Sequence, residues 1–142
     1  MNTELLISPA ASECLRSRIS PGKEVFCRSL FFSARWFVFS NCARKGTHLI
    51  VLPDRESAEY CCNDLYTLIE GDRVFFLPNS GAGVEKSNYK SSLSIQRTTA
   101  VKKLLEPSED LKVIVTFPEA LDELIPVSTD IARDSLKIST GQ

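Results

Sequence analysis

The chain lacks an excess of charge of either sign and lacks long hydrophobic runs. Its 17 Lys and Arg residues nearly balance 18 Asp and Glu residues, giving a net charge of −1. A near-neutral chain has no general attraction to nucleic-acid phosphates, so any such role needs a local patch or further parts of a larger protein. No run approaches the roughly 18 apolar residues that span a bilayer, and residues 1–20 lack the basic start and apolar core of a signal peptide. We expect a cytoplasmic protein with no membrane partner.

Cysteine and histidine are too sparse to predict a metal site or a disulfide framework. The five cysteines are odd in number and show no C-x-x-C spacing. They are Cys14, Cys27, Cys42, Cys61 and Cys62. Neighbouring helix residues point about 100° apart, so we interpret Cys61 and Cys62 as ordinary thiols rather than a redox pair. The single histidine, His48, is interpreted as a strand-start residue, because no second imidazole or nearby cysteine nucleophile accompanies it.

Apolar and charged residues, at 43% and 25%, are present in the proportions of an ordinary globular domain. Residues 1–20 read as an N-terminal leader with a short helix around Ala10 to Ser17. Short apolar runs then alternate with segments long enough for a helix, which predicts an α/β fold with a parallel sheet of about five strands and helices on both faces. The predicted strands are Val25 to Leu30, Leu49 to Leu52, Val74 to Leu77, Val113 to Val115 and Leu136 to Ser139.

Four helices follow from local signals. Asp54 is a good N-cap for a helix that Gly71 ends, and Pro118 fits the first turn of another. A third helix is expected from Ser92 or Ser94 to Pro107, with Val101, Leu104 and Leu105 facing inward and Lys102 and Lys103 facing solvent. The first helix, 33–43, is apolar almost all round, which predicts that it is the most buried helix or faces a partner.

The segment 29–36 is interpreted as a degenerate phosphate-binding loop between a strand and a helix. A working loop needs glycines that let backbone N–H groups close on phosphates, a lysine for the β and γ phosphates, and a hydroxyl for magnesium. Here a phenylalanine is expected to block the cradle, and a tryptophan cannot ligate magnesium. The loop positions are Ser29, Phe32, Ser33, Arg35 and Trp36. No catalytic residue, nucleotide or metal is therefore expected here.

A second candidate site is the segment 79–92, which has two glycines and no apolar periodicity. We expect an irregular surface loop. Lys86, Tyr89 and Lys90 are suited to contact phosphates and to stack on bases, so a nucleic-acid or partner contact is the functional alternative.

An ordered series of segments resembles the start of the bacterial transcription-repair coupling factor, over about residues 22–142. The series includes His48 to Tyr60, Asn63-Asp64-Leu65, Arg73 to Pro78, Ser94-Ile95-Gln96-Arg97 and Val113 to Leu121, and it closes with Gly141-Gln142. The resemblance implies that residues 21–142 are the N-terminal portion of the first UvrB-like domain (domain 1a), RecA/helicase-like in fold, stopping before the UvrA-binding domain. The sequence departs from the family pattern at 79–83.

The resemblance implies a parent protein that recognises stalled RNA polymerase, translocates on DNA using ATP and magnesium in distant motor domains, and recruits UvrA in nucleotide excision repair. This chain would be a non-catalytic scaffold that packs against the rest of the parent. Two alternatives are an active P-loop ATPase or helicase domain and a free-standing α/β regulatory module. Against the ATPase, the sequence has no predicted strand that ends in consecutive acidic residues to hold magnesium. A regulatory module would need an acidic cluster at the ends of the strands, and only Asp54 is so placed.

Overall fold

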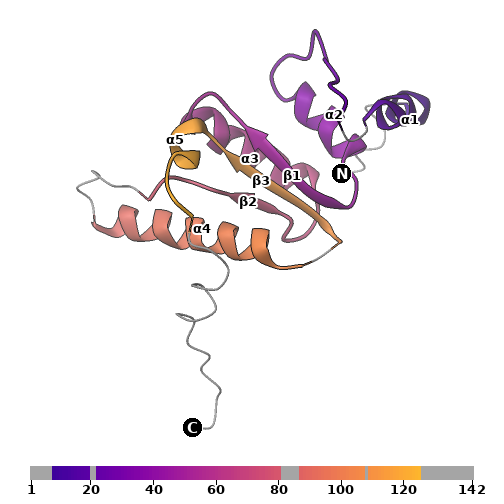
Figure 1. The fold of residues 1–142 in the computed structure, drawn as a ribbon. Coiled ribbons are helices and arrows are strands. Elements are labelled where there is room, and N and C mark those ends of the chain that lie inside the picture. The colour runs from indigo at the N-terminus through magenta and orange to yellow at the C-terminus, as the bar shows by residue number, and fades with distance from the viewer. Residues whose placement is uncertain (1–7, 20–21, 81–86, 108, 126–142) are drawn as a thin grey trace.

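The computed structural model describes residues 8–19, 22–80, 87–107 and 109–125, which form a mixed α/β fold (Figure 1). Five helices and three strands alternate along this part of the chain. In order, they are α1 (Pro9–Arg18), α2 (Ala34–Cys42), β1 (Gly46–Val51), α3 (Arg55–Leu68), β2 (Val74–Phe76), α4 (Ser87–Leu105), β3 (Leu111–Thr116) and α5 (Pro118–Leu121). The leader helix, α1, is confirmed, and the Ser8 hydroxyl accepts a hydrogen bond from the Ala11 N–H at its start.

The sheet is open, parallel and three-stranded, in the order β1-β3-β2. The last strand in sequence is therefore central, with Gly46 opposite Leu111 on one side and Val74 opposite Val113 on the other. The predicted strand at Val25 to Leu30 is wrong, because residues 22–29 are exposed and unpaired with the sheet. The predicted strand at Leu136 to Ser139 lies outside the described residues.

Helices cover both faces of the sheet, because side chains of the central strand alternate between two apolar clusters. Val113 and Val115 pack with α3 and with Trp36 of α2, whereas Ile114 packs with Ala100 and Val101 of α4. Residues in a strand point to opposite faces in turn, so a strand with core on both sides reads as a continuous apolar run. Figure 1 shows α4 on one side of the sheet and α3 on the other.

Helix α3 is fixed by its cap and by its apolar face. Asp54 Oδ1 accepts the Ser57 N–H at 2.7 Å, as predicted for an N-cap. Four of its side chains are buried, against two in α2, so α2 is not the most buried helix of the described residues, and the alternative that it faces a partner stays a prediction. The polar residues Ser40 and Asn41 of α2 account for part of this difference, since both side chains bond the Phe37 carbonyl within that helix.

Helix α4 begins earlier than predicted, at Ser87 instead of Ser92 or Ser94. Its inward residues include Leu93, Arg97, Ala100 and Val101. The prediction that Leu104 and Leu105 face inward is wrong, because both side chains are exposed. The buried Lys112 of β3 closes the helix by donating from Nζ to the carbonyls of Lys103, at 2.8 Å, and Glu106.

Candidate functional site

The C-terminal part of the segment 29–36 is held by a hydrogen bond to α3 and by packing in the core. The Ser33 hydroxyl donates to Asp64 Oδ2 of α3 at 2.7 Å, and the Trp36 ring is buried in the cluster between α2, α3 and the sheet. The N–H groups of Trp36 and Phe37 both bond the Ser33 carbonyl, which starts α2 at this point. The loop is therefore bonded to the helical layer, although the described residues before it, 8–19 and 22–28, contain no strand.

Two non-glycine residues of this loop adopt left-handed backbone conformations. Ser29 has a φ of 60° and Phe32 has a φ of 50°, which lie in a region that residues other than glycine rarely occupy. The Phe31 and Phe32 side chains are 71% and 90% exposed. The Phe32 ring is exposed at the surface of the loop, and the expectation that it blocks a phosphate cradle stays a prediction.

Arg35 is exposed, as expected for a cation that no glycine-rich cradle aims at a phosphate. Its guanidinium lies 4.5 Å from the centroid of the Trp36 ring, a cation–π contact. The positive charge lies close enough to Cys61 to oppose, in part, the rise that burial causes in the pKa of that thiol.

The second candidate segment is not an irregular loop throughout. Lys86 lies outside the described residues, whereas Tyr89 and Lys90 lie in the N-terminal part of α4. The expectation of an irregular loop over 79–92 is therefore wrong for 87–92. The role of these three residues in binding nucleic acid or a partner stays a prediction.

A buried ionic network at the carboxyl end of the sheet was not anticipated. Arg97 of α4 donates to the carbonyls of Pro78, at 2.7 Å, and Ala120, at 3.1 Å, and its Nε lies 3.5 Å from Glu123 Oε2. Glu123 also accepts the Ser80 N–H at 2.8 Å. This network joins α4 to the segments that follow β2 and β3. The sequence signal was an arginine four residues after Leu93 on the inward face of α4.

The acidic and hydroxyl side chains at the ends of β1 and β3 are engaged in hydrogen bonds. Asp54 follows β1, but its carboxylate is occupied by the N–H and hydroxyl of Ser57. Thr116, at the end of β3, donates its hydroxyl to the Leu77 carbonyl at 2.9 Å and is fully buried. Strand-end side chains here serve capping and packing.

The buried thiols are held protonated. Desolvation raises the pKa of Cys61 and of Cys62 to about 12, and neighbouring groups add smaller effects. Such thiols are poor nucleophiles, because the thiolate is the reactive form. His48 lies in β1 with Nε2 at 2.9 Å from the Arg44 carbonyl and its ring edge against Phe39.

Within 8–19, 22–80, 87–107 and 109–125, no group of three or more His, Cys, Asp and Glu side chains is placed to hold a metal ion. None of the helices in these ranges is both long and apolar enough to cross a bilayer. Comparisons with protein-family models, with curated proteins and with solved structures gave no match.

Proposed function

We propose that the chain is a non-catalytic, UvrB-like scaffold module of a bacterial transcription-repair coupling factor. The ordered series of segments from residue 48 to residue 121 supports this proposal, and their alternation agrees with a parallel α/β sheet. In this role, residues 21–142 are part of domain 1a, packed against the rest of the parent chain. The parent binds DNA and RNA polymerase and uses ATP and magnesium in its motor domains.

The observation that carries the non-catalytic part is the loop 29–36. It contains no glycine, and its Phe31 and Phe32 side chains project from the turn where a phosphate loop would present bare backbone N–H groups. Trp36 stands at the position where a working phosphate-binding loop has the hydroxyl that ligates magnesium, and its side chain is buried in the core. We interpret these features as a degenerate P-loop in a RecA/helicase-like domain, although the described residues 22–28 do not form the strand that normally precedes such a loop.

An active P-loop ATPase or helicase domain is the second candidate, and the same loop argues against it. A free-standing regulatory module is the third, and it would need free carboxylates at strand ends, where Asp54 is already a cap. Neither alternative explains the series of segments that resembles the coupling factor.

The experiment is a pull-down of UvrA with residues 1–142 and with the encoded protein extended through the following domain. We expect capture only by the longer protein, because in the resembled family the UvrA-binding domain follows the portion that residues 21–142 resemble. Capture of neither would contradict the family assignment. Equal capture by both would move the UvrA site into this domain.

A further inference from the structure

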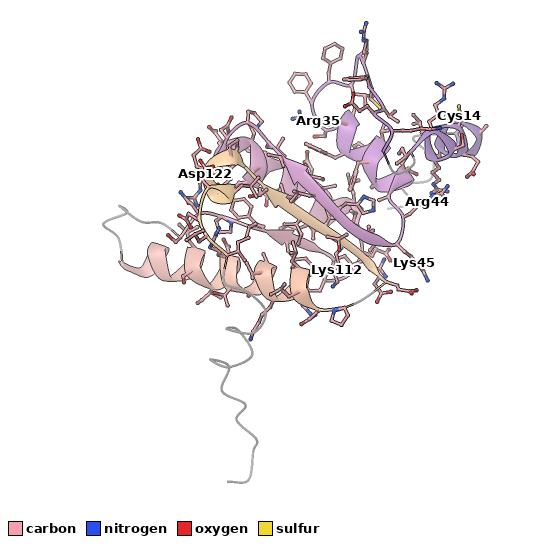
Figure 2. All side chains as sticks on the ribbon, in the orientation of Figure 1. Cys14, Arg35, Arg44, Lys45, Lys112 and Asp122 are labelled. Carbon is pink, nitrogen blue, oxygen red and sulfur yellow. The ribbon has the colours of Figure 1, made fainter. Side chains whose placement is uncertain are left out.

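The near-zero net charge conceals two oppositely charged parts. Residues 1–48 hold seven Lys and Arg against three Asp and Glu, a net charge of +4, whereas residues 49–142 hold ten against fifteen, a net charge of −5. Figure 2 shows Arg35 near the start of α2, and Arg44 and Lys45 where the chain turns into β1. All three are exposed. The basic residues therefore gather on the part of the molecule that contains α1, α2 and the segment between them.

Exposed aromatic rings lie in the same part. Phe26 is 82% exposed, and with Phe31 and Phe32 it gives three largely exposed phenylalanines within seven residues. Single exposed apolar residues are ordinary, but a cluster of large ones marks an interaction site. Among residues 22–35, which we call the aromatic-basic segment, these rings are interleaved with Lys23, Arg28 and Arg35, and Glu24 is the one acidic residue.

The segment is attached to a rigid base at its C-terminal end. The Ser33 hydroxyl bonds Asp64, the Ala34 N–H donates to the Phe31 carbonyl at 3.1 Å, and Trp36 is buried in the core. Phe31 and Phe32 therefore stand on a turn that is joined directly to α2. Rings presented in this way lose little conformational freedom when a ligand stacks on them.

We propose that the aromatic-basic segment binds single-stranded nucleic acid. Phe26, Phe31 and Phe32 stack on bases, and Lys23, Arg28 and Arg35 contact phosphates. Stacking tolerates any base because each has a π face, and cations along the same segment follow the backbone. A partner protein with an apolar surface would leave the cations unused, and an acidic peptide would leave the rings unused. The inference is independent of the scaffold role proposed above.

The test is fluorescence anisotropy of the whole 142-residue chain with labelled 20-nucleotide oligo(dT), oligo(U) and duplex DNA. We expect saturable binding to at least one single strand in the micromolar range at 50 mM salt, and weaker binding to the duplex. The preference between oligo(dT) and oligo(U) identifies the nucleic acid. Absence of saturable binding to both single strands, or stronger binding to the duplex, would overturn the proposal.

Variants separate stacking from charge. The double variant Phe31→Ala/Phe32→Ala should weaken single-strand binding at least about tenfold, since each stacked base contributes a factor of that order. Arg28→Gln/Arg35→Gln should reduce the slope of log affinity against log salt by about 1.4, at roughly 0.7 per phosphate contact. The matched controls Ile95→Ala/Leu124→Ala and Arg73→Gln/Lys102→Gln change exposed residues outside the segment and should leave binding unchanged.

Two further outcomes would overturn the proposal. One is full affinity in the double phenylalanine variant, because binding would then be electrostatic only. The other is equally tight binding of a labelled polyglutamate peptide, which would make the surface a contact for an acidic protein. Circular dichroism checks that each variant is folded. Substitutions of exposed side chains disturb packing least, so the variants are expected to fold.

Discussion

At the scale of single residues, Phe32 combines a left-handed backbone with an exposed ring. Because the ring packs against little, a substitution at Phe32 measures the free-energy cost of the backbone conformation rather than a loss of packing. A left-handed conformation costs a residue with a Cβ roughly 1–2 kcal/mol, and glycine avoids that cost. We predict that Phe32→Gly leaves the free energy of unfolding within about 0.5 kcal/mol of the wild type or raises it. The β-branched Phe32→Val should lower it by about 1 kcal/mol or more. Urea melts of the two variants check this, and a larger loss for Phe32→Gly than for Phe32→Val would contradict it.

The thiols give a second prediction at this scale. At pH 8, iodoacetamide should modify the exposed Cys14 and Cys27 and spare the buried Cys42, Cys61 and Cys62 until the protein is unfolded, as peptide mass spectrometry would show. Burial raises the pKa of Cys61 and Cys62 to about 12, so both thiols stay protonated in the folded state while the unfolded chain ionises near pH 8.5. Their contribution to stability is thus complete below about pH 8.5 and declines as the pH rises toward 12. Rapid native labelling of Cys61 or Cys62 would show that the α3 face opens.

At the scale of elements, the contact between α4 and the strand ends depends on Arg97. Replacing it by Met removes donors to the carbonyls of Pro78 and Ala120 and leaves the Glu123 carboxylate without its cation. Removal of one partner from a buried pair costs about 3–5 kcal/mol. Glu59→Gln, in the more exposed Arg55–Glu59 pair at 2.7 Å, is the matched control and should cost no more than about 1 kcal/mol. Equal losses in denaturant melts would mean that the Arg97 network is solvated.

The same scale explains which elements could be predicted. The helix after Asp54 and the strand at Val113 to Val115 carry local signals, a cap and a continuous apolar run, and both are confirmed. The run Val25 to Leu30 has the composition of a strand but no partner in the described sheet, and composition alone does not record pairing. The early start of α4 was missed because its first turn has no apolar periodicity. Arg97 could not be assigned a role because its acceptors are carbonyls 19 and 23 residues away in sequence.

At the scale of the whole molecule, the described sheet has three strands, and two helical layers bury a core on each face. Among the described residues, side chains at the strand ends form a helix cap, a threonine hydroxyl bond and the Arg97 network, which agrees with the proposed scaffold role. The basic residues lie around α1 and α2, whereas the sequence from residue 49 onward has a net negative charge. A chain with this division of charge can contact a polyanion through its basic part, although its net charge gives no general attraction to polyanions.

We propose that this α/β module carries a phosphate-loop position without nucleotide chemistry. Isothermal titration calorimetry of the whole chain with ATP and magnesium tests it most directly, at protein concentrations that detect micromolar affinity. We predict no saturable heat, because residues 29–36 supply neither a glycine cradle nor an oxygen ligand at Trp36. Saturable micromolar binding of magnesium-ATP that is lost in Arg35→Ala would contradict the claim and identify an active P-loop domain.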